Sequence, residues 1–462
     1  MLTVQFLSVT LAPILIGLML ATLYGRYCVR YSTAQLAGYG LILGMLSSTV
    51  LLRLLHILQL SFHPASFLLA CVLTAACATA VLLLGPRLAI PHRVTLLCSI
   101  SWETLLLLVC ISFIAARLVL LAEEALVRPL SGWDVTMHWA TKAKVWLNQG
   151  SMVPFVDNQA WLTAGDGVFT DHHPDYPTSI PLLQVWMGLA LGGWSETVVS
   201  LPWVITGTAL LLLFFGGALV AGASPVVAVI FTYLLASLPL LGSHIAIAGY
   251  ADLLLGAVYL AALQALLSWS RYRDRASLLL LCLFALAAPT VKNEGLFWTA
   301  TLLPGVLLVL ISPRKLRILL LSGTAVLGVF ALLAPADFTV AGHSLERMGF
   351  GFRSVAPSAL AQQIFIFGSW HLTGILLLLS VFLVARYPSL LAGLGAIAMP
   401  LAAAVVMYLF LFTATRFSYG AIHGTASNRI ALHLIPSLLF LVALLAQRYF
   451  YRDHLRSDSA AS

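Results

Sequence analysis

The stretch LLAGLGAIAMPLAAAVVMYLFLFT, residues 390–413, carries no charged side chain and is long enough to cross a lipid bilayer as a helix. Similar apolar runs recur along the whole chain of 462 residues, which is 61% hydrophobic and only 9% charged. The mean hydropathy is +1.01. Water-soluble domains of this length carry far more charge, so the sequence predicts an all-α, polytopic membrane protein. The length of the runs excludes a transmembrane β-barrel, whose strands need only about 10 residues.

The apolar runs predict about 13 membrane crossings. They lie at residues 2–22, 36–56, 66–85, 96–121, 178–193, 199–221, 226–243, 251–268, 276–290, 295–311, 316–334, 363–385, 390–413 and 429–447. The run at 178–193 is short and has Pro177 and Pro181 at its start. We expect this run not to make a full crossing, because a comfortable span needs about 20 residues.

Short basic loops set the expected orientation of the chain in the membrane. RYCVR (26–30), RYRDR (271–275) and PRKLR (313–317) should lie in the cytoplasm by the positive-inside rule. This places the long loop 122–177 on the outer face of the membrane. The net charge of +8 comes mainly from arginine. It indicates orientation among membrane lipids rather than binding of nucleic acid.

Five ionisable residues lie at the ends of apolar runs on the predicted outer side. They are Asp134, Asp252, Lys292, Glu294 and Arg429. Ionisable groups near a membrane are costly and tend to be functional. Their presence at one face, from segments far apart in the sequence, predicts a single polar site there.

The stretch SGWDVTMHWATKAKVWLNQG, residues 131–150, opens the polar part of the outer loop. Asp134, His138 and Lys142 are four residues apart and would share one face of a helix. The neighbouring face carries tryptophans, so we expect an amphipathic helix in the membrane interface with its tryptophans at headgroup depth. A simple interfacial anchor is the alternative interpretation. Of the two lysines, helical phase favours Lys142 over Lys144 as a site residue.

The stretch DHHPDYPTSIP, residues 171–181, closes the same loop. Asp171, His172, His173 and Asp175 are of the types that bind metal ions, and Tyr176 follows them. Adjacent residues of an extended chain point in opposite directions, so His172 and His173 do not easily bind one ion. Substrate positioning or turn chemistry is therefore favoured for this stretch. No cofactor is firmly implied, and a divalent metal ion held by His172 and Asp175 stays open.

Later segments supply cations suited to an anion. Lys292, in APTVKNEGLFW (288–298), would hold a phosphate as a point charge. Arg429 and His433 are four residues apart in TRFSYGAIHGTASNRIALHLIP (415–436), and Arg416 precedes them. The structural alternatives are a Lys292–Glu294 pair, contact of Arg429 with lipid headgroups, and capping of a helix by Asp252.

Together these motifs resemble the GT-C class of membrane glycosyltransferases, which use polyprenyl-phosphate-linked sugars. The class is similar to the protein mannosyltransferases and to the bacterial enzymes that modify lipid A. The matching segments are GWDVTMHWATKAK (132–144), HHPDYP (172–177), GYAD (249–252), VKNEG (291–295) and SNRIALHLIP (427–436). The resemblance implies a catalytic module over 96–334 and C-terminal spans over 335–447. The polar composition of the tail at 448–462 predicts a disordered cytoplasmic segment. Residues 1–95 would be extra spans, a departure from the common pattern.

The resemblance also implies roles for the residues. The acid of the first outer loop, here Asp134, would bind and deprotonate the acceptor hydroxyl of a glycan, lipid or protein. Cations would stabilise the lipid phosphate that leaves. The candidates for that task are Lys142, Lys292, Arg416, Arg429 and His433. The acceptor and the sugar would contact His138, His173, Asp175, Tyr176, Asp252 and Glu294, three of which compete for the role of second acid: Asp175, Asp252 and Glu294.

Three other classes remain as alternatives. A transporter or lipid flippase would place charges in the middle of its spans and show inverted repeats, whereas the charges here lie at span ends. An enzyme that ligates or polymerises whole lipid-linked glycans would carry its largest loop late in the chain, whereas here the early loop is the largest. A non-catalytic subunit would not need the set Asp134, Lys292 and Arg429.

Overall fold

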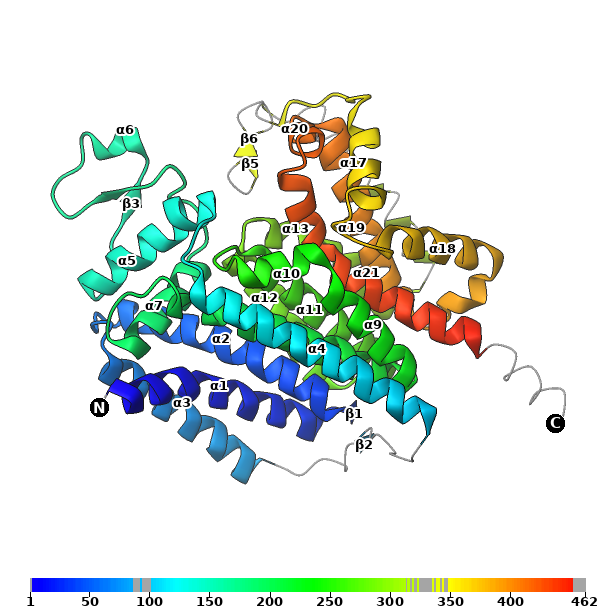
Figure 1. The fold of residues 1–462 in the computed structure, drawn as a ribbon, viewed down its shortest axis with the longest axis horizontal. Helices are drawn as coiled ribbons and strands as arrows, with labels where there is room; N and C mark the ends of the chain where they lie inside the picture. Colours follow the sequence, from blue (N-terminus) through cyan, green and yellow to red (C-terminus); the bar gives the residue numbers. More distant parts are fainter. Residues whose placement is uncertain are drawn as a thin grey trace.

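The structure is a computed structural model, and it is almost entirely helical (Figure 1). It describes residues 2–85, 92–93, 101–312 and 348–451, together with a few short pieces at 314–315, 318–319, 322–323, 335, 338–340 and 343–344. The predicted span at 316–334 lies mostly outside the described residues. So does the predicted tail, except that its first residues, 448–450, belong to the last helix rather than to a disordered segment.

The N-terminal part consists of four long helices. They are α1 (Leu2–Tyr27), α2 (Thr33–Ile57), α3 (Pro64–Leu84) and α4 (Trp102–Val127). Two short parallel strands, β1 (Arg30–Tyr31) and β2 (His92–Arg93), pair between these helices. Polar side chains begin two of the helices: Ser32 accepts a hydrogen bond from the Gln35 N–H, and Ser101 accepts one from the Thr104 N–H. Such caps satisfy amide groups that the first helical turn leaves without partners.

The long loop after α4 forms a small unit that projects from the helical bundle (Figure 1). It contains a π-helical turn, η1 (Val135–Trp139), which leads directly into α5 (Ala140–Gln149). The rest of the unit consists of β3 (Phe155–Val156), α6 (Asn158–Trp161) and β4 (Phe169–Thr170), with β3 and β4 paired in parallel. A π-turn adds one residue to a helical turn and is frequent at functional sites.

The middle of the chain holds the helices that form the core. They are α7 (Ser179–Leu191), η2 (Val198–Ser200), α8 (Leu201–Ala221), α9 (Pro225–Ser237), α10 (Pro239–Ala246), α11 (Asp252–Tyr272), α12 (Arg275–Val291), α13 (Glu294–Thr301) and α14 (Leu303–Leu310). Within the most apolar window of α11, 94% of the residues are buried. Helices α2, α8, α12 and α21 (Ala426–Phe450) pack around it. The central helix therefore carries its end residue Asp252 deep inside the protein.

The C-terminal part adds a second projection on the same side of the bundle as the loop unit (Figure 1). The C-terminal part of the chain contains β5 (Thr339–Val340), β6 (His343–Ser344), α17 (Ala356–Phe365), α18 (Thr373–Arg386), η3 (Pro388–Leu391), α19 (Gly395–Ala414) and α20 (Ser418–Ile422), before α21. The strands β5 and β6 pair in antiparallel fashion.

Eight of the described helices are long and apolar enough to cross a membrane. The bent pair α9 and α10, with 62° between its halves at Pro239, adds a ninth if it counts as one span. The expected total of about 13 crossings is thus not confirmed. Three of the apolar runs form helices of only 13, 17 and 14 residues, which are α7, α12 and α18. The 13 residues of α7 reach only about 20 Å, in line with the expected incomplete crossing at 178–193.

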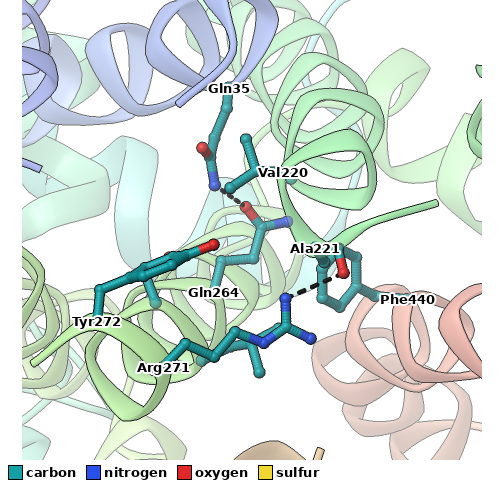
Figure 2. A pocket seen from close by; sticks show the side chains of 10 residues that line it. Gln35, Val220, Ala221, Gln264, Arg271, Tyr272 and Phe440 are labelled. Carbon is teal, nitrogen blue, oxygen red and sulfur yellow. Dashed lines mark hydrogen bonds between the residues drawn. The ribbon is translucent and has the colours of Figure 1, made fainter. Parts of the chain in front are cut away.

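A small polar cavity lies between α2, α8 and α11, near the end of α11 that is remote from Asp252. Gln35 donates a hydrogen bond to Gln264 beside this cavity, and Arg271 donates one to the Ala221 carbonyl (Figure 2). Its volume is about 10 Å³, the size that holds a single water molecule. This cavity is too small for an organic substrate, so the candidate site lies elsewhere.

Candidate active site

A cavity of about 1080 Å³ opens where the loop unit, the break between α12 and α13 and the start of α21 meet. One part of its wall is polar and includes Asp134, His172, His173, Asp175, Tyr176, Lys292, Glu294 and Arg429. Another part is apolar and includes Met348, Met407, Phe410, Leu411, Phe417 and Ile430. The cavity is thus large enough for an organic ligand and has both a charged and an apolar face.

Asp252 is the central residue of a group of charged and polar side chains behind the polar wall. It begins α11, its side chain is completely buried, and it contacts three basic groups. The Lys292 Nζ lies 2.9 Å from Oδ1, the His433 Nε2 lies 2.9 Å from the same oxygen, and Arg429 lies 3.2 Å from Oδ2. A buried carboxylate with this many donors is stabilised in its charged form. Asp252 therefore fixes the two cations that line the cavity, Lys292 and Arg429.

His433 is held in one tautomer by its two neighbours. The Trp298 indole N–H, which can only donate, points to the His433 Nδ1 at 3.0 Å. Nδ1 is therefore an acceptor, and the imidazole proton sits on Nε2, where it is donated to Asp252. A neutral histidine of this kind orients the carboxylate without adding a third charge.

Arg429 contacts carboxylates through all three nitrogens of its guanidinium group, and its side chain is 26% exposed. Its Nε and Nη2 donate to Asp252, at 3.3 and 3.2 Å, and its Nη1 donates to the Asp134 Oδ2 at 2.7 Å. The Tyr250 ring lies against the guanidinium, with 4.3 Å from the guanidinium carbon to the ring centre. Arg429 is thus a bridge between the buried Asp252 and the partly exposed Asp134.

Lys292 lies where α12 ends and the chain turns into α13. Pro289 lies in the last turn of α12, and the backbone of Lys292 is extended. Burial by itself would lower the pKa of Lys292, but the carboxylates of Asp252 and Glu294 outweigh it and raise the pKa above its ordinary value. The Glu294 carboxylate is 3.0 Å from the ammonium group. Lys292 is therefore a permanent positive charge at the cavity wall.

A second buried ion cluster lies in the loop unit beside the cavity. The Asp171 carboxylate forms an ion pair with Lys142 at 2.7 Å and contacts the His138 Nδ1 at 2.5 Å. Burial alone would raise the pKa of Asp171, but the His173 N–H and the Lys142 ammonium more than offset it and lower the pKa. Asp171 is therefore charged in the folded protein.

Several of the expected site residues lie outside the cavity wall. His138, Lys142, Asp252 and His433 are buried and are not part of the cavity wall, because each is enclosed by the partners described above. The binding roles expected of these four residues stay predictions, and the structure places their side chains behind the wall rather than in it. Arg416 is exposed and is also not part of the wall.

The tryptophans of the segment 131–150 differ in their surroundings. Trp133 is exposed, but Trp139 and Trp146 are buried among protein side chains. Trp139 packs against Tyr176 and Tyr250, and the Trp146 indole donates to the Val153 carbonyl. The segment is therefore a packed wall element rather than a lipid anchor. Lys144, the other lysine of the segment, pairs with Glu196 at 2.9 Å.

The remaining expected site residues do meet in one place. Asp134, His173, Asp175, Tyr176, Lys292, Glu294 and Arg429 all line the cavity, and so does His172. Their chemical roles stay predictions. In the part of the chain that the structure describes, no three His, Cys, Asp or Glu side chains are grouped in a way that could hold a metal ion.

Some functional neighbours had no clear signal in the sequence. In the sequence, Asp171 stands out only as one of several possible metal ligands, and Trp298 is one of many apolar residues. Trp139 lines the cavity, and its buried indole N–H has no partner within the protein. An unpaired buried donor at a cavity wall is a place where a ligand oxygen would be stabilised.

No protein-family model, curated protein or solved structure matches this chain. The function is therefore inferred from the side chains that line the cavity and from the sequence resemblance.

Proposed function

We propose that this protein is an inverting membrane glycosyltransferase. It would transfer a sugar from a polyprenyl-phosphate donor to an acceptor hydroxyl of a glycan, lipid or protein at the outer face of a bacterial inner membrane. The observation that carries the proposal is the composition of the large cavity. A carboxylate, Asp134, and two cations, Lys292 and Arg429, share it with an apolar wall. A donor with a charged phosphate and a hydrocarbon tail needs both kinds of surface.

The proposed reaction assigns one task to each side of the cavity. Asp134 takes the proton of the acceptor hydroxyl, and the acceptor oxygen attacks the anomeric carbon of the sugar. The bond between that carbon and the phosphate oxygen breaks, and the lipid phosphate leaves with the electron pair. Lys292 and Arg429 stabilise the negative charge that develops on the phosphate. The reaction needs no nucleotide.

The ion pair between Arg429 and Asp134 supports an order of binding. Asp252 is enclosed by Lys292 and His433 as well as by Arg429, so it is not easily displaced. Asp134 is a quarter exposed, at 25%, and faces the cavity. A phosphate that approaches Arg429 would therefore replace Asp134 rather than Asp252. The donor would thus release Asp134 from its cation just before Asp134 has to act as a base.

A transporter or lipid flippase is the second candidate, because of one observation. Transporters often contain broken helices, and α9 and α10 form such a pair, bent by 62°. However, neither helix contributes a residue to the wall of the large cavity. The charges at the cavity wall and directly behind it also lie at helix ends: Lys292 follows α12, Arg429 is in the first turn of α21, and the buried Asp252 begins α11. The transferase therefore has the stronger support.

The test has two steps. A panel of polyprenyl-phosphate sugars is first screened for donors that raise the thermal midpoint of the purified protein. Transfer of the sugar from such a donor to an acceptor is then measured. Asp134→Asn should lower the rate of transfer at least about 100-fold, because it removes the general base. The same variant should bind polyprenyl phosphate at least as tightly as wild type, because Arg429 loses a competing carboxylate. Asp166→Asn is the matched control, an exposed acid of the same loop that does not line the cavity.

Full activity of Asp134→Asn would refute its role as the base. Lys292→Ala should weaken binding of polyprenyl phosphate, and unchanged affinity would refute the phosphate site. A wild-type protein that moves lipid-linked sugar across vesicle membranes, without transferring it to an acceptor, would support the flippase instead.

A further inference from the structure

The buried cluster His138–Lys142–Asp171 has no place in the proposed chemistry, although it lies next to the cavity. The side chains of Lys142 and Asp171 are only 2% and 1% exposed. Neither residue lines the cavity, nor does His138. A charged pair this deep costs desolvation energy and is weak evidence for stability, because apolar residues often serve as well. The pair therefore calls for an explanation other than stability.

The cluster forms hydrogen bonds with both backbone groups of His173. The Asp171 Oδ1 accepts a hydrogen bond from the His173 N–H at 3.0 Å. The Lys142 Nζ donates to the His173 carbonyl at 2.7 Å. Since Lys142 and Asp171 are also paired with each other, the peptide groups on both sides of His173 are fixed relative to α5.

His173, which the cluster holds in this way, forms part of the cavity wall. The His173 ring stacks on the Tyr176 ring, with 4.6 Å between centres and 3° between planes. The edge of the His138 ring packs against both of these rings, at 4.9 and 5.5 Å. His173 and Tyr176 line the cavity together with Asp134, which lies four residues before His138. One rigid unit therefore holds both the proposed base and the aromatic wall beside it.

We propose that Asp171 is a positioning residue for the acceptor, acting through Lys142 and His138. It fixes the stacked His173–Tyr176 pair relative to Asp134, so that a polar acceptor which rests on the two rings presents its hydroxyl to the carboxylate. This inference rests on the proposed function. Catalysis is sensitive to such placement, since a shift of about 1 Å can cost about 100-fold in rate.

The experiment compares Asp171→Asn with wild type by two measurements. The first is amide hydrogen exchange of the segment 171–177, which should become faster because the His173 N–H loses its charged acceptor. The second is steady-state kinetics of transfer, in which the KM for the acceptor should rise at least about tenfold. The affinity for polyprenyl phosphate should change less than twofold, because Lys292 and Arg429 are untouched. A purely structural defect would lower both affinities together.

Glu196→Gln is the matched control, since it breaks the exposed ion pair that Lys144 of α5 forms with Glu196. It should alter neither measurement. If Asp171→Asn does not fold, the double variant Lys142→Met with Asp171→Asn carries the same test, because it leaves no unpaired charge in the interior.

Each outcome decides a definite point. Unchanged amide hydrogen exchange at 171–177 would contradict the claim that Asp171 fixes the backbone of His173. Faster exchange with an unchanged acceptor KM would overturn the positioning role. A wild-type protein without transferase activity would overturn the proposed function and the positioning role that rests on it. Hydrogen exchange would still show whether Asp171 fixes the backbone of His173.

Discussion

Arg429 illustrates how single residues in this protein combine charges that would be costly alone. Its guanidinium joins Asp252, which has no exposed surface, to Asp134 at the cavity. Lys292 approaches Asp252 from another helix, so each buried charge has an opposite partner. Charges near a membrane are tolerated when they are paired in this way. The same pairing leaves Asp134 and Lys292 at the cavity wall, where a substrate would reach them.

The lowered pKa values of two residues in the loop unit, His173 and Asp171, predict that the folded protein is less stable in acid. Burial and the nearby His138 and His172 lower the pKa of His173 from 6.5, so the unfolded chain takes up that proton more readily. Stability should therefore begin to fall as the pH drops below about 6.5. Asp171, whose pKa is lowered from 3.8, should add a further loss below about pH 4.

The measurement is the thermal midpoint of unfolding in detergent between pH 7.5 and about 3.5. His173→Gln should remove the decline near pH 6 and leave the one below pH 4. A midpoint that is constant from pH 7.5 to 5 in wild type would contradict the prediction.

At the scale of elements, the N-terminal helices are tightly joined to the rest of the bundle. Helix α2 packs against both α1 and α8, and α1 also packs against α7. Gln35 of α2 donates to Gln264 of the central helix α11 (Figure 2). Gly40 and Gly44 of α2 form a GxxxG pattern that faces α1 and allows the two backbones to approach closely. Helices α1 and α2 are therefore part of the support for the core.

Gly17→Leu should destabilise this contact. A Cβ atom at Gly17 would lie 2.0 Å from the Gly40 carbonyl oxygen and 2.2 Å from the Gly44 nitrogen, so the helices would have to separate. Overpacking of this kind costs about 1–3 kcal/mol, which should appear as a lower thermal midpoint. Gly165→Ala is the control, because no atom lies within 4 Å of the added carbon. Equal midpoints for the two variants would show that α1 and α2 do not need this contact.

At the scale of the whole molecule, the two ends of the bundle differ in character. The end with the cavity carries the carboxylates and cations described above. At the other end, arginines donate to carbonyl groups at or near helix ends: Arg271 to Ala221, Arg273 to Val309 and Arg448 to Leu390. Helix α11 connects the two ends, and its 21 residues span about 31 Å, the thickness of a bilayer core. This asymmetry is the one that the positive-inside rule predicts for an outer site.

Site-directed labelling tests that orientation. In a cysteine-free background, Ala164→Cys in the loop unit and Arg275→Cys at the start of α12 both place a thiol at an exposed position. A membrane-impermeant maleimide should label the first in intact spheroplasts and the second only after permeabilisation. The reverse pattern would place the cavity on the cytoplasmic face and exclude an outer site.

The sequence by itself determined that the chain is an all-α membrane-type protein, because long apolar runs and scarce charge are local properties. It also indicated which ionisable residues gather, since Asp134, Asp252, Lys292, Glu294 and Arg429 all mark ends of apolar runs. Only the tertiary structure decided which of these side chains reach the cavity and which are enclosed behind it. That depends on partners far apart in the chain, such as Asp134 and Arg429, which are 295 positions apart. Helical periodicity placed His138 and Lys142 on the face of Asp134, but packing against Asp171 made them a support of the wall rather than part of it.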